Sequence, residues 1–316
     1  MIFAEPAHTG VTGQHLGERF LMTVINYPVS GESSGSQLAP GLFPVLMFAP
    51  GFLRCAGTYA HLLRAWASAG YVVASVNFPR TSCQAAYEPD LVNQPADVSY
   101  VLGRLLALNA APGDVFSGRL NPRQVAAAGQ SDGGDTAAAL AASTCCRDHH
   151  LKAAAVLSGA EWPPMPGRYF TGGAPPMLFV QGSADTINPP WASIQLYRSD
   201  RAGPRYYLNL TGASHMAPYA GDNPVERLVA RITLAFFARY VLGDAGVLTT
   251  MTRLGNSTGI ATLSSGGQLE SGCPVASAGP QSCADSTAPR AGGTHGKRSG
   301  RGIARPLTTF TPSRQL

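Results

Sequence analysis

The first candidate for chemistry in this sequence is Ser131, in the segment Gly129-Gln130-Ser131-Asp132-Gly133, which matches the pattern Gly-x-Ser-x-Gly. Where this pattern joins a buried strand to a helix, the serine lies on a sharp turn and its hydroxyl is exposed at the edge of a sheet. A serine hydroxyl with its ordinary pKa is a weak nucleophile and needs a neighbouring base. Ser131 is therefore a candidate nucleophile whose base must come from elsewhere in the chain.

The pattern is weak evidence by itself, because it occurs three times in this chain, around Ser33, Ser131 and Ser257. Only Ser131 follows a short apolar run, 124–128, and precedes a run of small helix-forming residues, 134–142. Ser33 lies in a loop rich in Gly and Ser, and Ser257 lies near the polar C-terminal tail. We therefore assign the nucleophile to Ser131; the alternative is an ordinary glycine-rich turn between a strand and a helix.

His215 is the candidate base, because it follows an apolar strand pattern late in the chain. When a serine nucleophile lies on a strand–helix turn, its histidine comes from a loop late in the chain. An isolated histidine is more often structural, but the position of His215 in the chain order favours catalysis. The other candidates lie in an early helix, in the tail or in surface segments. The chain has seven histidines in all: His8, His15, His61, His149, His150, His215 and His295.

A carboxylate between Ser131 and His215 is needed to orient the imidazole and to stabilise its charged form. Asp185 follows the apolar run 177–181 through a tight Gly-Ser-Ala-Asp turn, and we favour it. Glu161, which follows the preceding strand, is the competing residue. The structural alternative for Asp185 is a helix N-cap.

An oxyanion formed during acyl transfer needs two hydrogen-bond donors. One would be the backbone N–H of Asp132, directly after the nucleophile. The other would be the N–H of Phe52, which follows the strand 43–49, and Gly51 beside it permits close approach of the backbone. No side chain is required, so this assignment depends on position alone.

Apolar residues in the loops at the same edge predict a pocket for an apolar or aromatic part of a substrate. We expect Trp162, Trp191 and Met216 to bind substrate, together with Phe52 and Tyr219. The alternative for each is that it only covers the core. No long insertion interrupts the pattern of strands and helices, so we expect an open cleft and small to medium substrates.

The elements that must position these residues alternate between strand and helix. Most of the strand patterns are continuously apolar, as expected for parallel strands covered on both faces. The sequence therefore predicts an α/β fold with a mostly parallel central sheet and helices on both faces, entered by an antiparallel strand at 20–28. The other predicted strands are 43–49, 71–77, 124–128, 152–157, 177–181 and 205–210, and the predicted helices are 59–69, 96–108, 133–143, 192–199 and 225–241.

The composition predicts one catalytic domain, 1–265, followed by a low-complexity and disordered tail, 266–316, rich in Ser, Gly, Thr and Pro. Most of the net charge of +5 lies in this tail, so the domain offers no basic surface for nucleic acid. No apolar run is long enough to span a membrane. The N-terminus lacks a signal-peptide pattern, which predicts a cytoplasmic protein, or a secreted one if a leader is missing.

Six cysteines leave the redox compartment open. Cys55 and Cys83 follow two strands expected to be neighbours, so a disulfide between them is one alternative. Cys145 and Cys146 are adjacent, and we do not expect them to pair. With His149 and His150 they form a compact cluster, but its spacing matches no usual zinc pattern, so no metal and no other cofactor is expected.

Together these motifs resemble the α/β-hydrolase superfamily over about residues 20–240. Within it, the chain is similar to serine esterases grouped with dienelactone-hydrolase-like proteins, platelet-activating-factor acetylhydrolases, chlorophyllases and polyester hydrolases. The segments that carry the resemblance are Phe48-Ala-Pro-Gly-Phe52, Gly129-Gln-Ser-Asp-Gly-Gly134, Gly182-Ser-Ala-Asp185 and Gly212-Ala-Ser-His215.

Three positions depart from or extend the resemblance. Dienelactone hydrolases use a cysteine nucleophile, whereas this chain has Ser131. Gln130 and Asp132 flank the serine where polyester hydrolases usually carry an aromatic residue or histidine and a methionine. Trp162, however, occupies a position at which polyester hydrolases place an aromatic residue beside the substrate.

The resemblance implies a carboxylic ester hydrolase that forms an acyl-enzyme and acts as a monomer on small-molecule apolar or aromatic esters. Two alternatives use the same site: an acyltransferase and a cutinase-like polyester hydrolase. A third is a binding protein that keeps the fold without catalysis, which an intact set of Ser131, His215 and Asp185 disfavours.

Overall fold

The computed structural model describes residues 1–30, 37–201 and 203–266, all of which belong to one compact unit, Met1–Gly272. Ser33 and residues 267–316 of the predicted tail lie outside the described residues. The predicted disorder of that tail therefore stays a prediction. None of the described helices is long and apolar enough to cross a membrane.

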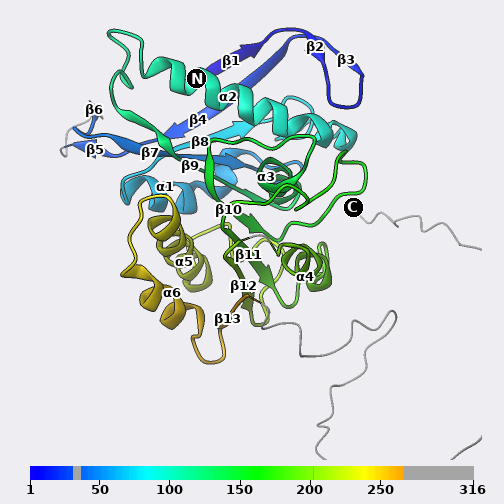
Figure 1. Ribbon diagram of the computed structural model, residues 1–316, viewed down its shortest axis with the longest axis vertical. Helices are drawn as coiled ribbons and strands as arrows, with labels where there is room; N and C mark the ends of the chain where they lie inside the picture. The colour runs from blue at the N-terminus through cyan, green and yellow to red at the C-terminus, as the bar shows by residue number, and fades with distance from the viewer. Residues whose placement is uncertain (31–36, 202, 267–316) are drawn as a thin grey trace, which may run out of the picture. The chain divides into compact units, whose positions relative to one another are not determined.

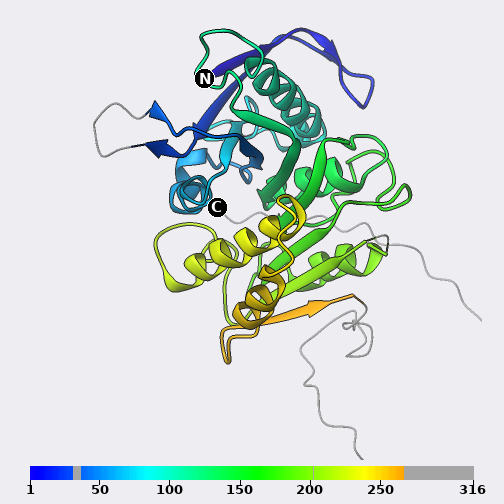
Figure 2. The ribbon, with the colours of Figure 1, turned by 60° about the vertical axis from the view of Figure 1, so that its left-hand side comes forward.

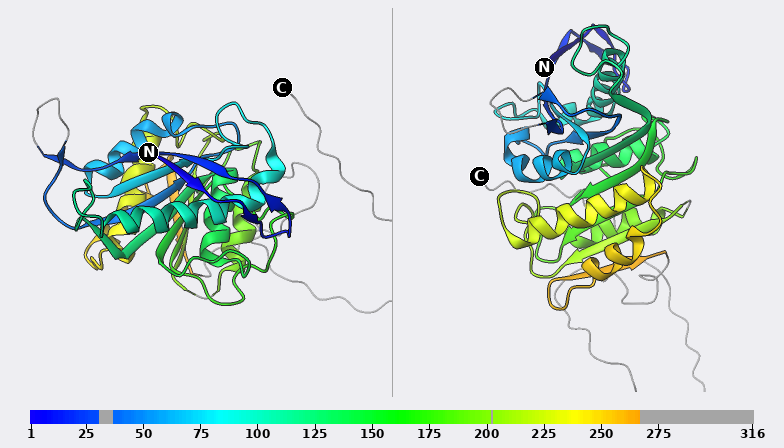
Figure 3. Two further views of the ribbon diagram at one scale, coloured as in Figure 1. Left: turned by 90° about the horizontal axis from the view of Figure 1, so that it is seen from above. Right: turned by 90° about the vertical axis from the view of Figure 1, so that its left-hand side faces the viewer.

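A nine-stranded sheet forms the centre of the described structure (Figure 1). Its strand order is β1-β4-β8-β7-β9-β10-β11-β12-β13, so β1 lies at one end and β13 at the other (Figure 3). The strands are β1 (Ile2–Glu5), β4 (Arg19–Asn26), β7 (Phe43–Ala49), β8 (Val72–Asn77), β9 (Leu120–Gln130), β10 (Leu151–Leu157), β11 (Met177–Gly182), β12 (Arg205–Leu210) and β13 (Ala261–Ser265).

The six central strands, from β8 to β12 in the sheet, pair in parallel, whereas β1, β4 and β13 join at the two ends in antiparallel pairs. Parallel neighbours end at the same edge of a sheet, so the loops after β7, β9, β11 and β12 converge there. The predicted α/β fold with a mostly parallel sheet is confirmed.

Two hydrophobic layers cover the sheet, one on each face. Along β7, Leu46 and Phe48 pack into a cluster with helices α1, α5 and α6, while Val45 and Met47 pack into a second cluster with α2, α3 and α4. Figure 2 shows α5 and α6 side by side on their face. The helices are α1 (Ala60–Ser68), α2 (Gln94–Leu108), α3 (Asp132–Ala142), α4 (Pro190–Ser199), α5 (Pro224–Tyr240) and α6 (Val247–Gly255).

The predicted elements all form, with small changes at their ends, and several short elements were not predicted. Strand β9 is longer than expected, because Leu120 pairs with Phe43 of β7 ahead of a register shift, and Gly129 and Gln130 continue the pairing with β10. Strands β1 and β13 and helix α6 were missed. The remaining short elements are β2 (His8–Thr9), β3 (His15–Leu16), β5 (Val29–Ser30), β6 (Gln37–Leu38) and two 3₁₀ turns, η1 (Ala56–Tyr59) and η2 (Glu88–Asn93).

A buried ionic network attaches the antiparallel end of the sheet to η2 and α2. The guanidinium of Arg19, at the start of β4, donates to both carboxylate oxygens of Asp97 at 2.6 Å and to those of Asp90 at 3.1 and 2.7 Å. All three side chains are buried. Burial raises the pKa of Asp97, the bonds from Arg19 oppose that shift, and nearby Glu5 adds to it. Asp97 is therefore structural.

Replacement of Arg19 by Ala is expected to lower the free energy of unfolding by about 3–5 kcal/mol, because it leaves two carboxyl groups buried without their cation. Urea unfolding followed by circular dichroism measures the change. Arg123→Ala, at an exposed position on β9, is the matched control. Equal stabilities of the two variants would show that the network contributes nothing to the fold.

Candidate active site

Ser131 lies on a strained turn between β9 and α3. Its backbone has φ 57° and ψ −125°, values that a non-glycine residue adopts only when its surroundings impose them. The turn also requires glycine at two neighbouring positions, because a Cβ atom there would clash with the backbone. A Cβ on Gly129 would lie 1.9 Å from the carbonyl oxygen of Gly133, and a Cβ on Gly133 would lie 1.9 Å from the carbonyl oxygen of Ala49. The turn thus directs the Ser131 hydroxyl out of the sheet edge.

The imidazole of His215 lies between Ser131 and Asp185. Its Nε2 is 2.9 Å from Oγ of Ser131, and its Nδ1 is 2.8 Å from Oδ2 of Asp185. These residues follow β9, β11 and β12, so the parallel sheet brings together three segments that are far apart in the sequence. The arrangement can transfer a proton from the serine hydroxyl to the imidazole.

The Asp185 carboxylate is buried and accepts four hydrogen bonds. Its Oδ1 accepts from the backbone amides of Ile187 and Asn188, each at 3.0 Å, and its Oδ2 accepts from His215 and from Nε2 of Gln181 at 3.0 Å. Burial alone would raise the pKa of Asp185, but the bonds from His215 and the two amides outweigh it, so the pKa lies below its ordinary value. Asp185 is therefore ionised at neutral pH and can only accept.

Because Asp185 can only accept, Nδ1 of His215 carries the proton and Nε2 presents its lone pair to Ser131. The side chain of Gln130 lies beside this nitrogen. Its Nε2 is 3.2 Å from Nε2 of His215 and donates to the His215 carbonyl at 3.2 Å. Its Oε1 accepts from the hydroxyl of Tyr59 at 2.7 Å, and that hydroxyl accepts from the Gly51 amide at 3.1 Å. Gln130 thus connects the base to the loop after β7.

The two predicted oxyanion donors lie in the loops on either side of Ser131. Among the described residues, neither the Phe52 amide nor the Asp132 amide donates to another residue. The Asp132 amide is the first in α3, so it has no acceptor within the helix. The Phe52 amide is thus available to a ligand oxygen next to Ser131, and the Asp132 amide, which donates to the carboxyl of its own residue, would have to exchange that acceptor for the ligand oxygen.

The loop that carries Phe52 is tied to the loop after β8. A disulfide joins Cys55 to Cys83, and it is flanked by backbone hydrogen bonds from Leu53 to Thr81 at 2.7 Å and from Cys83 to Arg54 at 3.2 Å. The disulfide left open by the sequence is therefore present in the structure. It fixes the end of the loop that presents the Phe52 amide.

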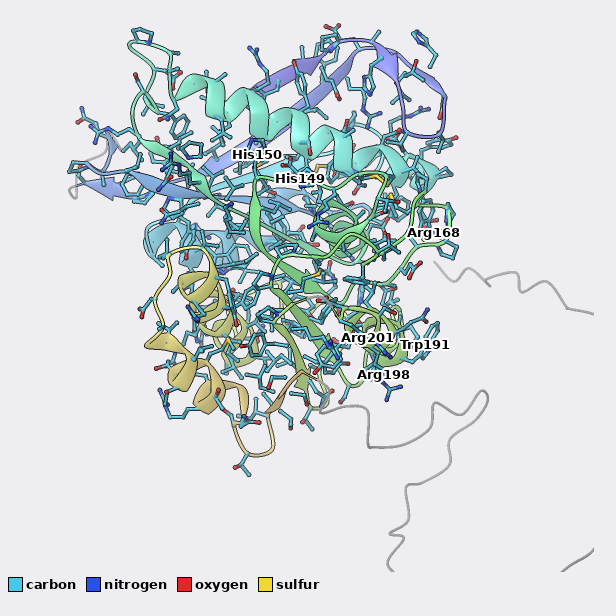
Figure 4. All side chains as sticks on the ribbon, in the orientation of Figure 1. His149, His150, Arg168, Trp191, Arg198 and Arg201 are labelled. Atoms are coloured by element: carbon cyan, nitrogen blue, oxygen red, sulfur yellow. A yellow bond between two sulfur atoms is a disulfide. The ribbon has the colours of Figure 1, made fainter. Side chains whose placement is uncertain are left out.

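The residues predicted to bind substrate have different surroundings. Trp162 is half-buried and packs against Leu91 in η2 and Ala139 in α3, while Met216 is half-buried against the core. Trp191, at the start of α4, is 55% exposed and lies at the periphery of the structure (Figure 4). The expectation for Tyr219 was wrong: it is fully buried, and its hydroxyl bonds to Ser158 and Val180 in the core.

The other candidates from the sequence take no part in the contacts among Ser131, His215 and Asp185. Glu161 is exposed and takes no part in the bonds to His215, and Ser257 only bonds to the end of α6 through its hydroxyl. Cys145 and Cys146 form a disulfide with each other, contrary to our expectation. The imidazole of His150 bonds to Asp148 (Figure 4 shows its position). Within the part of the chain that is described, no cluster of three or more His, Cys, Asp or Glu residues could hold a metal ion.

Sequence reasoning missed the side chains that hold the acid and the base in place. Gln181, at the end of β11, donates to Asp185 and accepts from the hydroxyl of Ser193 in α4. Asn188 donates to the carbonyl of Ser158 at 2.7 Å and so attaches the acid loop to β10. A polar residue at the end of an otherwise apolar strand, as at Gln130 and Gln181, is the signal that could have indicated them.

The sequence profile of one protein family, described as PET hydrolase-like, matches residues 23–260 and thus most of the unit Met1–Gly272. The matched range includes every residue of the constellation described above. No curated protein matches the chain.

Replacement of Gln130 by Met keeps the length of the side chain but removes its bonds to His215 and Tyr59. We expect kcat for an activated ester to fall about tenfold with little change in KM, because the base is less firmly positioned. Gln195→Met, at an exposed position on α4, is the control. An unchanged kcat in a folded Gln130→Met variant would exclude this positioning role.

Replacement of both Cys55 and Cys83 by Ala releases the end of the loop that carries Phe52. Removal of an oxyanion donor costs roughly 10²–10³ in kcat, so partial misplacement should cost about tenfold. The paired variant Cys145→Ala/Cys146→Ala, whose disulfide lies away from the Phe52 loop, should retain more of its kcat. Equal losses in the two double variants would contradict a specific role for Cys55–Cys83.

Proposed function

The chain belongs to the PET hydrolase-like family, a polyester-hydrolase group with the α/β-hydrolase fold, and we propose that it hydrolyses carboxylic esters through an acyl-enzyme on Ser131. Membership of the family implies an ester hydrolase. The observation that carries the finer proposal is the continuous set of contacts from Ser131 through His215 to Asp185.

In the acylation half-reaction, Oγ of Ser131 attacks the ester carbonyl carbon while Nε2 of His215 accepts the hydroxyl proton. Asp185 stabilises the resulting imidazolium through Nδ1, and the amides of Phe52 and Asp132 bind the oxyanion. When the tetrahedral intermediate collapses, the carbon–oxygen bond to the alcohol breaks. His215 returns its proton to that alcohol, and the acyl group remains on Ser131.

Deacylation repeats these chemical steps with water as the nucleophile. His215 takes a proton from the water, the hydroxide oxygen bonds to the acyl carbon, and the same amides bind the second oxyanion. The bond to Oγ of Ser131 then breaks, Ser131 regains its proton from His215, and the carboxylic acid leaves. No cofactor takes part in either half-reaction as we propose it.

The apolar surroundings of the site support small to medium apolar or aromatic esters as substrates, with Trp162 and Met216 against the bound ester and Trp191 at the margin.

A specific observation favours polyesters as well. Large apolar side chains in the loops after the parallel strands and at the start of α4 are exposed, as expected for contact with a solid polymer surface. They are Leu53 at 43%, Tyr87 at 46%, Trp191 at 55% and Ile187 at 67% exposure.

The two disulfides support an oxidising compartment, since such bonds are rare in the reducing cytosol. Of the two alternatives that the sequence left open, we therefore propose the secreted protein over the cytoplasmic one. This proposal follows from cysteine chemistry and is independent of the catalytic assignment.

Ser131→Ala should lower kcat/KM for p-nitrophenyl butyrate by about 10⁴ or more, because no other group can form the acyl-enzyme. The same variant should release no soluble product from an aromatic polyester film. Ser257→Ala, which removes the serine of a second Gly-x-Ser-x-Gly segment, is the matched control and should retain wild-type rates. Wild-type turnover by Ser131→Ala would remove Ser131 from the mechanism.

A further inference from the structure

The side chain of Asp132 has no role in the steps above, although its backbone amide does. Asp132 directly follows Ser131 and begins α3. Its carboxyl group is therefore attached to the same residue whose N–H faces the developing oxyanion. A charge on this carboxyl is close enough to His215 for the two groups to attract each other.

This carboxyl is enclosed and incompletely paired. Its Oδ2 is buried and has no hydrogen-bond partner among the described residues. Its own backbone amide donates to the carboxyl group, but Oδ2 has neither solvent nor a donor, so an ionised carboxylate here keeps much of its field. The absence of a partner distinguishes Asp132 from Asp185, whose two oxygens accept four bonds.

The charged and titratable groups around Asp132 come from several elements. Glu88 in η2 adds negative charge, and His215 is the nearby base that attracts the carboxylate. Asp135, in the next turn of α3, is fully buried, and burial raises its pKa well above the ordinary value. Tyr59 in η1 also interacts with Asp132, and Arg54 in the loop after β7 faces Tyr59. The tyrosine hydroxyl is neutral, because burial raises its pKa above the ordinary value.

Burial raises the pKa of Asp132 to about 7, the negative charge of Glu88 adds to the increase, and attraction to His215 opposes it. The carboxyl is thus protonated and neutral below about pH 7 and ionised above it. The charge beside Ser131 therefore changes in the range in which the enzyme would work.

Building on the proposed ester hydrolysis, we propose that Asp132 determines charge specificity, selecting neutral acyl groups over acyl groups that carry a carboxylate. A substrate carboxylate close to the reacting carbonyl would be repelled by Asp132. Like charges at short range in a partly buried site cost more than the same pair in water. Neutral ester segments would be accepted, and hydrolysis of acidic half-esters, which are products of diester cleavage, would be disfavoured.

The test compares two substrates of nearly the same shape, methyl 4-nitrophenyl adipate and 4-nitrophenyl hydrogen adipate, whose chain is too long for the carboxylate to attack its own ester readily. Both release 4-nitrophenol from the same bond, but only the second carries a carboxylate, which stays ionised above about pH 5.5. The measured quantity is the ratio of kcat/KM for the neutral ester to that for the anionic ester. Any pH-dependent step that is common to both substrates cancels in this ratio.

For the unmodified protein, the ratio should rise about tenfold between about pH 5.5 and pH 8.5, with a midpoint near the pKa of Asp132. In Asp132→Asn, which keeps the backbone N–H and the side-chain shape, the ratio should be low and independent of pH. Glu88→Gln should move the midpoint to lower pH, because it removes a charge that raises the pKa of Asp132. Glu18→Gln, at an exposed position, is the control and should not move it.

A ratio that does not change with pH in the unmodified protein would overturn the proposal, as would the same pH dependence in folded Asp132→Asn. If Asp132→Asn does not fold, the pH dependence of the ratio in the unmodified protein and the midpoint in Glu88→Gln still test the proposal. Failure of the proposed function looks different: Ser131→Ala would then continue to release 4-nitrophenol from both substrates.

Discussion

The hydrogen bond between Nδ1 of His215 and the Asp185 carboxylate determines what the rest of the site can do. Asp185 is ionised and accepts four hydrogen bonds, so the imidazole must donate from Nδ1 and present Nε2 to Ser131. If that bond is lost, the imidazole can turn and take the other tautomer. Ser131 would then lose its proton acceptor even though its own turn were intact.

The fold supplies the precision that this bond needs. Parallel pairing brings the ends of β9, β11 and β12 to one edge, and cores on both faces of the sheet keep those ends in place. Gln130 and Gln181 then hold the base and the acid from strand ends. The strained backbone of Ser131 is maintained by the same packing, since no local preference of the chain favours it.

Much of this arrangement could be predicted from the sequence, because buried parallel strands are continuously apolar and catalytic loops follow them. The expected positions of Ser131, Asp185 and His215 depended on that order. The hydrogen-bond partners of Gln130 and Gln181 could not be predicted, since a polar residue at the end of an apolar strand indicates a special position but not which groups it contacts. Tyr219 was misplaced because its loop position did not reveal the turn that directs its ring into the core. The pairing of Cys145 with Cys146 depends on local backbone geometry that the sequence does not specify.

The most direct test of the account is the site and rate of covalent labelling by a fluorophosphonate, determined by peptide mass spectrometry. This reagent reacts with a serine only when a neighbouring base activates it. The account predicts one adduct, on Ser131, and a labelling rate that falls by orders of magnitude in His215→Ala. An adduct on another serine, or an unchanged rate in a folded His215→Ala variant, would contradict it.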